Sequence, residues 1–260
     1  MSFFEAVVIA IVEGITEFLP VSSTGHMVIT QALLGMESDA FLRAYTVNIQ
    51  FGAILSVVVI YWKSFFRSLD FYFRLFVACL PLVIAYLLEK QIDMMLASVW
   101  VVAVALLLGG IVLLYVDRWF AGGQEEKEGT ITYRSAFIIG LFQIISVIPG
   151  VSRSAATIVG GMSRKLSRKT AAEFSFFLAV PTMFAASLLK LGGQYHTFTT
   201  QDIRLLLLGN LVSFLVAMLA IRTFIHYLTR HGFRAFGWYR IGLGVILLVL
   251  LLSGSKLDVL

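Results

Sequence analysis

The sequence has few of the residues on which soluble and secreted proteins depend. Only 13% of its 260 residues are charged, about half the share that is typical of soluble proteins. The single cysteine, Cys79, excludes an internal disulfide framework and leaves no cysteine cluster for a metal. Residues 1–12 lack the basic segment and the small-residue cleavage site of a secretory signal, so we expect them to belong to the mature protein.

Apolar residues are abundant instead and make up 59% of the chain. A helix needs roughly 17–25 predominantly apolar residues to cross a hydrocarbon core of about 30 Å. We therefore expect an all-α polytopic membrane protein that forms a single membrane domain over residues 1–260. Stretches of sufficient length predict six transmembrane helices, at about 45–62, 74–89, 98–116, 172–191, 204–225 and 237–252.

Two further apolar stretches, about 3–35 and 135–162, are interrupted near the middle. The first breaks around Pro20 and the second around Pro149. Proline removes a backbone donor and disfavours helix in the preceding residue, so each stretch is left with two arms too short to span the membrane. We therefore predict two re-entrant helical hairpins, whose irregular turns need surrounding protein or a water-filled cavity.

Arginine and lysine are unevenly divided between the two sides that this topology defines. Of the 20 basic residues, fourteen fall on the side opposite the N-terminus, five fall on the N-terminal side and Arg153 falls inside the membrane. The positive-inside bias places the fourteen in the cytoplasm and both termini outside. Because the basic residues lie in short loops, we attribute the net charge of +5 to membrane orientation and not to nucleic-acid binding.

The two halves of the chain, about 1–117 and 131–252, resemble each other on either side of a polar linker at 118–130. Pro20-Val-Ser-Ser-Thr-Gly-His aligns with Pro149-Gly-Val-Ser-Arg-Ser-Ala. Because three spans, an odd number, separate the two hairpins, the second copy has to be inverted. Inverted-topology repeats with broken helices that meet near the midplane are typical of transporters.

The first break is preceded by two carboxylates that are costly at membrane depth. Glu13 and Glu17 lie four residues apart, hence on one helix face, where unpaired carboxylates repel each other. A divalent cation, Mg²⁺ or Ca²⁺, would remove the repulsion, because both ions prefer hard oxygen ligands. The alternative is that both glutamates lie in an exposed N-terminal helix at the interface.

Ser22, Ser23 and Thr24 follow the break, where a new helix is expected to begin. These residue types favour N-caps, and a helix N-terminus also binds anions through its free backbone donors. Gly25 lets a ligand approach closely. His26 lies three residues after Ser23 on the same face, which predicts a hydroxyl–imidazole pair for nucleophilic catalysis. Simple capping and a hydrogen-bonded structural histidine are the alternatives.

The second break places Arg153 among Ser152, Ser154 and Thr157. Arginine binds phosphate bidentately, and hydroxyls beside a helix N-terminus complete a phosphate cradle. The alternative is an ion pair between Arg153 and Glu173, or the Glu13–Glu17 pair, that holds the hairpins together. Glu173 is equally well explained as a carboxylate at a helix start.

The strings Glu13-Gly-Ile-Thr-Glu17-Phe-Leu-Pro-Val-Ser-Ser-Thr-Gly-His26 and Pro149-Gly-Val-Ser-Arg-Ser-Ala-Ala-Thr-Ile158 resemble the signatures of the bacterial undecaprenyl pyrophosphate phosphatases, the bacitracin-resistance family. The resemblance covers the whole chain. It implies removal of one phosphate from a C55 isoprenoid pyrophosphate, with a divalent cation, to regenerate the carrier lipid of cell-wall synthesis. It also implies acidic roles for Glu13 and Glu17, nucleophile or general-base roles for Ser23 and His26, and phosphate binding by Arg153.

The expected function is therefore that of an integral phosphatase of the bacterial inner membrane, with its active site on the external side. A secondary transporter or polyprenyl-phosphate translocase is the alternative from another class, because it would share the inverted hairpins. A structural scaffold would leave the acidic pair, His26 and Arg153 unexplained. The sequence leaves open whether Ser23 or His26 is the nucleophile, which metal is preferred, and whether the chain forms a homodimer.

Overall fold

The computed structural model describes residues 1–37, 39–65, 69–87, 95, 98–120, 131–191 and 198–254, and among these it contains helices and no strand. The all-α prediction is therefore confirmed for this part of the chain. In chain order the helices are α1 (Phe3–Thr16), α2 (Ser23–Leu33), α3 (Ala40–Ile60), α4 (Trp62–Phe65), α5 (Leu69–Cys79), α6 (Leu82–Leu87), α8 (Val99–Trp119), α9 (Tyr133–Ile145), α10 (Arg153–Ser163), α11 (Arg168–Leu191), α12 (Thr200–His231) and α13 (Arg234–Leu252).

Four of these helices are long and apolar enough to cross a membrane, namely α3, α8, α12 and α13. Large apolar side chains on their outer faces are well exposed, for example Leu219 at 68% and Val249 at 59%. A contiguous apolar surface of this kind is unfavourable in water and indicates contact with lipid. The chain is therefore a multi-pass membrane protein.

The predicted span at 74–89 is not one continuous helix. α5 ends at Cys79 and α6 begins at Leu82, because Pro81 lacks the N–H that a continuing helix needs. Residues 88 and 89 lie outside the described part of the chain. The other five predicted spans correspond to α3, α8, α11, α12 and α13.

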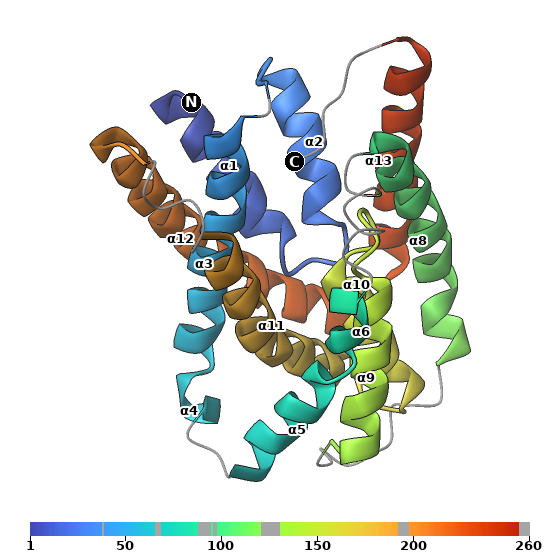
Figure 1. The fold of residues 1–260 in the computed structure, drawn as a ribbon. Coiled ribbons are helices and arrows are strands. Elements are labelled where there is room, and N and C mark those ends of the chain that lie inside the picture. Colours follow the sequence, from blue (N-terminus) through green and yellow to red (C-terminus); the bar gives the residue numbers. More distant parts are fainter. Residues whose placement is uncertain are drawn as a thin grey trace.

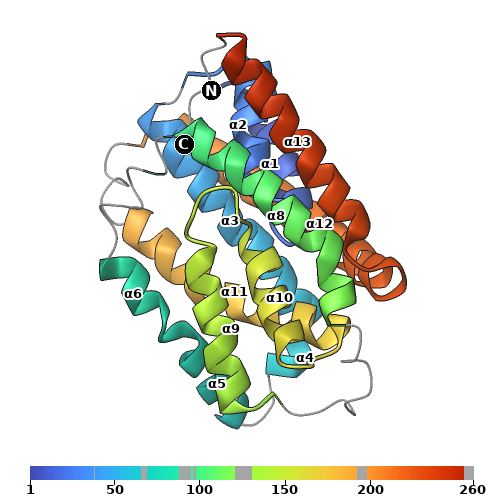
Figure 2. The same ribbon diagram turned by 90° about the vertical axis from the view of Figure 1, so that its right-hand side faces the viewer.

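The two interrupted stretches fold as helical hairpins, here called hairpin one (α1 and α2) and hairpin two (α9 and α10). Hairpin one lies on the side of the N-terminus, hairpin two on the opposite side, and their turns meet at mid-height (Figures 1 and 2). Their arms have 11 to 14 residues, so each reaches only about 16–21 Å at a rise of about 1.5 Å per residue. Such arms are too short to cross the membrane core.

The turns of the two hairpins share one backbone conformation. Ser22 (φ 71°, ψ 100°) and Ser152 (φ 73°, ψ 116°) both cap the following helix, and each hydroxyl accepts a hydrogen bond from the backbone N–H three residues later. The sequence alignment paired Pro20 with Pro149. The backbone instead pairs Ser22 with Ser152 and therefore Pro20 with Gly150, because hairpin two has one more residue between its proline and its cap.

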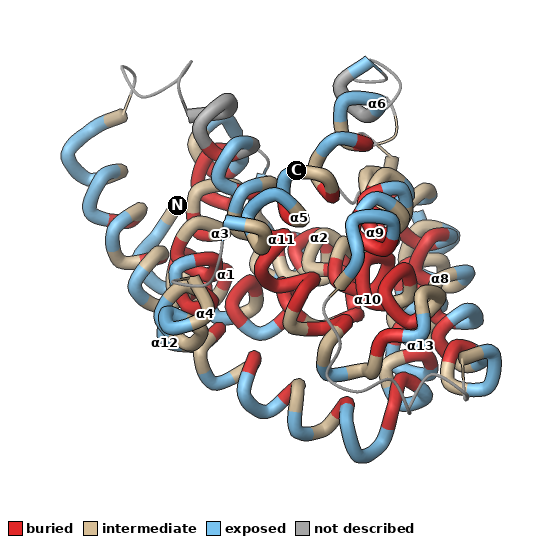
Figure 3. Tube along the Cα trace, turned by 90° about the horizontal axis from the view of Figure 1, so that it is seen from below, coloured by how far each residue is buried: buried red, intermediate tan, exposed pale blue. Residues whose placement is uncertain are grey.

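Buried residues concentrate where the hairpins meet α3 and α11 in the centre of the molecule (Figure 3). Phe18, from the turn of hairpin one, packs edge-to-face on Phe176 of α11 with ring centroids 5.2 Å apart. Outside this core, α8 packs along α13, and α12 packs along α1 and α3. The long helices thus form a frame that holds both turns in the interior.

Candidate active site

The turns of the two hairpins enclose a polar cavity of about 200 Å³. α2 begins at Ser23 and α10 at Arg153, so two helix N-termini meet at this cavity and make it favourable for an anion. The structure thus brings together the polar residues of the two breaks. The lining includes Glu17, Ser22, Ser23, Thr24, Gln50, Ser146, Ser152, Arg153 and Met183.

Glu17 connects the hydroxyl of one hairpin to the guanidinium of the other. Its Oε2 accepts a hydrogen bond from Ser23 Oγ at 2.8 Å. Its Oε1 accepts one from Arg153 Nη2 at 2.9 Å, in an ion pair whose side chains are 7% and 14% exposed. A carboxylate beside a hydroxyl is arranged to accept its proton, and a guanidinium beside both is arranged to hold a phosphate.

Arg153 is fixed from several directions. Its Nη1 donates to the backbone carbonyl of Ser175 at 3.0 Å, and its guanidinium lies 5.8 Å from the ring centre of Phe18. Of the alternatives that the sequence left open, an ion pair between the hairpins is present, and its acidic partner is Glu17. The same contact leaves Arg153 on the wall of the polar cavity.

Glu13 does not line the polar cavity and is completely buried. Neither of its carboxylate oxygens has a hydrogen-bond partner among the described residues, and it forms no ion pair there. Buried carboxylates without a partner are costly, so these oxygens fit a cation shared with Glu17. Because the described residues contain no cluster of three histidine, cysteine or acidic side chains, the remaining ligands of such an ion would be hydroxyls, water or phosphate oxygens.

His26 does not pair with Ser23, and that predicted contact is wrong. Its Nδ1 lies 2.8 Å from the carbonyl oxygen of Ser22, and its Nε2 lies 2.6 Å from the hydroxyl of Tyr239 on α13. Since a carbonyl can only accept, Nδ1 carries a proton, and in the neutral ring Nε2 accepts from Tyr239. These two contacts occupy both ring nitrogens of His26, and Ser23 donates to Glu17 instead.

Three other predicted phosphate ligands lie outside the polar cavity. Ser154 donates to the carbonyl of Leu19 in hairpin one at 2.7 Å, and Thr157 shares a hydrogen bond of 2.6 Å with Ser175. Gly25 packs against Leu106 of α8. Ser154 thus joins the two hairpins, whereas Thr157 joins α10 to α11 and Gly25 lies against α8. Ser22, Thr24 and Ser152 line the polar cavity, and their role as phosphate ligands stays a prediction.

Sequence reasoning counted Arg240, near the start of the predicted span 237–252, among the fourteen basic residues on the cytoplasmic side. The structure places it in the interior, completely buried. The guanidinium donates to four backbone carbonyls, those of Pro20, Ala105, Gly150 and Val151, at 2.9–3.2 Å. The cytoplasmic count therefore falls from fourteen basic residues to thirteen, which leaves the predicted orientation unchanged. The sequence did carry a signal for this buried position, namely a charged residue three positions inside a predicted apolar span.

Two larger apolar cavities flank the turns. One of about 820 Å³ lies among α1, α12 and α13 and includes His26 and Tyr239. The other, of about 620 Å³, lies among α8, α9 and α10 and includes Arg240. Both are lined almost entirely by apolar side chains, as suits hydrocarbon chains beside a polar site.

Fold and site together define an integral membrane protein with a polar cavity enclosed by two broken hairpins. The family described as "Bacitracin resistance protein BacA" matches residues 6–246. A protein of Flavobacterium psychrophilum named "Undecaprenyl-diphosphatase" is 56% identical over 254 residues, which cover 96% of each chain. Proteins of the same name from Porphyromonas gingivalis (54% identical, 100% of each chain) and Bdellovibrio bacteriovorus (50%, 99% of each chain) are also similar. The chain belongs to the bacitracin resistance protein family.

Proposed function

We propose that the chain hydrolyses undecaprenyl pyrophosphate to undecaprenyl phosphate and inorganic phosphate. The observation that carries this proposal is the Glu17–Ser23–Arg153 arrangement, in which a hydroxyl and a guanidinium from opposite hairpins share one carboxylate. Two helix N-termini add positive potential for a pyrophosphate. The names of the relatives agree with this chemistry.

The arrangement supports a two-step transfer with Ser23 as the nucleophile. Ser23 Oγ forms a bond to the terminal phosphorus while its proton passes to Glu17 Oε2, and the bond from that phosphorus to the bridging oxygen breaks to leave the lipid monophosphate. Arg153 holds the non-bridging oxygens of the transferred phosphate. Water then cleaves the phosphoserine, releases inorganic phosphate and restores the hydroxyl.

A divalent cation, Mg²⁺ or Ca²⁺, fits the same site. Glu13 and Glu17 would hold it, and when bound it supplies charge neutralisation for the pyrophosphate. The unpartnered oxygens of Glu13 support this part of the proposal. We expect a chelator to abolish turnover and added Mg²⁺ or Ca²⁺ to restore it. Full activity in excess chelator would contradict a metal requirement.

The membrane arrangement proposed with this function has six spans. Four are the long apolar helices, the fifth is formed by α5 together with α6, and the sixth is α11. The two hairpins then belong to halves related by an inverted repeat, which the matching caps at Ser22 and Ser152 support. Under the positive-inside bias the N-terminus and the mouth of hairpin one face the exterior of the inner membrane.

Phosphate release from undecaprenyl pyrophosphate by the purified protein in detergent tests the proposal, because a transporter needs a second compartment and releases none. We expect release by the wild type, loss of release in Ser23→Ala, and an acid-stable phosphoserine trapped at Ser23. An acid-labile phosphohistidine at His26 would replace Ser23 as the nucleophile. Absence of phosphate release with either cation would contradict the function.

A further inference from the structure

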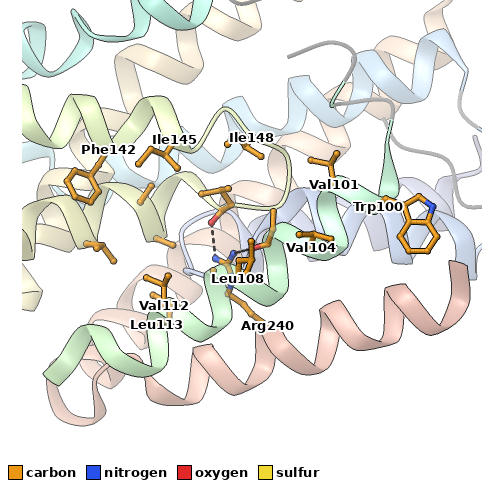
Figure 4. Close-up of a pocket in the computed structure, with 16 residues that line it drawn as sticks. Trp100, Val101, Val104, Leu108, Val112, Leu113, Phe142, Ile145, Ile148 and Arg240 are labelled. Atoms are coloured by element: carbon orange, nitrogen blue, oxygen red, sulfur yellow. Dashed lines mark hydrogen bonds between the residues drawn. The ribbon is translucent and has the colours of Figure 1, made fainter. Parts of the chain in front are cut away.

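We propose that Arg240 is a positioning residue of this site, which fixes both hairpin turns in the geometry that phosphoryl transfer requires. The inference rests on the proposed function but concerns a residue outside the polar cavity. It starts from the placement of the guanidinium, which lies between α8, α13 and the two turns and is completely buried. In Figure 4 it projects from α13 toward α8, and a dashed line marks a hydrogen bond that it donates.

The hydrogen bonds of Arg240 reach both hairpins at once. Nη1 donates to Pro20 in hairpin one at 3.2 Å and to Val151 in hairpin two at 2.9 Å. Nη2 donates to Gly150 in hairpin two at 2.9 Å and to Ala105 in α8 at 3.1 Å. Pro20 and Gly150 are the equivalent positions of the two turns, each two residues before the capping serine. One side chain thus joins corresponding carbonyls of the two halves.

Packing alone does not require a cation at this place. Gly110 of α8 meets the carbonyl of Gly237, and Gly244 of α13 meets the carbonyl of Ala103, so the two ends of the α8–α13 crossing are equivalent. This equivalence matches Ala103 with Gly237 and Gly110 with Gly244, and at the same spacing it matches Leu106 of α8 with Arg240 of α13. Leu106 is apolar and also completely buried. Among the described residues Arg240 forms no ion pair. A buried charge of this kind is costly, which points to a task that leucine cannot perform.

That task is to set the direction of the turn peptides. In a trans peptide the N–H points away from the C=O, so the carbonyls of Pro20 and Val151 that face Arg240 direct the N–H groups of Val21 and Ser152 the other way. Ser22 and Ser152, the caps of α2 and α10, line the polar cavity next to these peptides. Displacements of about 1 Å cost roughly 100-fold in rate when reacting groups have to be aligned.

The chain offers a second way to disturb this contact without removing the charge. A Cβ at Gly109 of α8 would overlap the Arg240 guanidinium. Gly242 of α13 has nothing within 4 Å of a Cβ at its position, so Gly242→Ala is the matched control for Gly109→Ala. Arg234, exposed at the start of the same helix, gives Arg234→Gln as the control for the loss of a cation.

The test compares kcat, KM and thermal unfolding of Arg240→Lys and Gly109→Ala with the wild type and the two controls in detergent. An ammonium cannot reach four carbonyls in a plane, so we expect kcat to fall about 10- to 100-fold. KM should change less than about threefold, because Arg153 still binds the phosphate, and both controls should behave as the wild type. If Arg240→Lys does not fold, Gly109→Ala decides.

Two results would overturn the proposal. The first is a folded Arg240→Lys or Gly109→Ala protein with a kcat within about twofold of the wild type. The second is a lower unfolding temperature with a normal kcat per folded molecule, which would make Arg240 a stabilising residue only. A wild-type protein that releases no phosphate would instead contradict the proposed function before any variant is compared.

Discussion

Glu17 has a different partner on each of its two carboxylate oxygens. One contact joins the two hairpins, and the other holds the hydroxyl of Ser23 beside a carboxylate. Ser23 donates to one oxygen and Arg153 to the other, so a single side chain joins the hydroxyl and the guanidinium that the proposed mechanism uses. The carboxylate is nearly buried. Its charge is therefore directed at these two neighbours and little screened by water.

Replacement of Glu17 by glutamine keeps the shape of the side chain and removes its ability to take a proton. We expect kcat for phosphate release to fall by about 10²–10⁴, the usual contribution of a general base. Glu5→Gln, in the first turn of the same helix, is the control, because glutamine can still complete the capping box there. Activity above about a tenth of the wild type in Glu17→Gln would exclude a role as base.

Tyr239 is expected to orient His26 and not to react itself. Tyr239→Phe removes one hydrogen bond of 2.6 Å, worth about 1 kcal/mol, so turnover should fall by no more than about fivefold. Steady-state kinetics on the purified variant measure this. A loss of more than about 100-fold would mean that the tyrosine hydroxyl takes part in the reaction.

Residue types at the two breaks were readable from the sequence, and so was a possible ion pair of Arg153 with the Glu13–Glu17 pair, but the partner of Ser23 was not. Spacing alone placed His26 on the face of Ser23, and it gave no sign that the turn would fold Glu17 back over the same hydroxyl. That contact depends on the positive φ of Ser22, a backbone state that few non-glycine residues adopt. The catalytic role of His26 therefore stays a prediction.

Helices α8 and α13 cross closely, and this crossing carries Arg240 into the interior. Glycines make the approach possible, since a Cβ at Gly110 would lie 2.8 Å from the carbonyl oxygen of Gly237. Helix interfaces in membranes commonly depend on small residues in this way. The α8–α13 crossing, which positions Arg240, thus depends on glycines that have no reactive side chain.

Gly110→Val should separate α8 from α13 and destabilise the protein by about 1–3 kcal/mol, the usual cost of overpacking. The unfolding temperature in detergent measures the effect, and Gly242→Ala, whose Cβ meets nothing within 4 Å, serves as the control. An unfolding temperature equal to that of the wild type would show that the crossing tolerates a larger separation.

Proline marked the breaks of both hairpins correctly, but it does not always end a helix, since Pro181 lies inside the continuous helix α11. The same rule applied to Pro81 would have divided the span at 74–89. Arg240 was misplaced for another reason: near the end of an apolar stretch, sequence cannot distinguish a side chain that reaches the loop from one that turns inward. Only the packing of α13 on α8 and the turns decides that direction.

At the scale of the whole molecule, the two hairpin turns share one cap geometry and carry different side chains. The shared cap geometry pairs Ser23 with Arg153, Glu17 with Val147 and Glu13 with Gln143. Hairpin one thus supplies the acidic and hydroxyl groups and hairpin two the cation. A pyrophosphate site needs both sets, so neither hairpin is sufficient alone.

The proposed orientation predicts that residue 23 is reachable from the exterior. In a Cys79→Ala background, Ser23→Cys should react with a membrane-impermeant thiol reagent added to intact cells, whereas the background alone should not. Undecaprenyl pyrophosphate should slow the reaction by occupying the cavity. Labelling only in membranes opened on the cytoplasmic side would reverse the orientation.

Phosphate-release kinetics of Glu17→Gln, Arg153→Lys and the double variant ask whether the two hairpins form one catalytic unit. Residues that act as a unit are strongly non-additive, and loss of an electrostatic contact to the transition state costs about 3–4 kcal/mol. We predict that each single variant loses at least about 100-fold in kcat/KM. The kcat/KM of the double variant should lie within about threefold of that of the less active single variant. Fully multiplicative losses, or a single variant with wild-type turnover, would contradict a shared site.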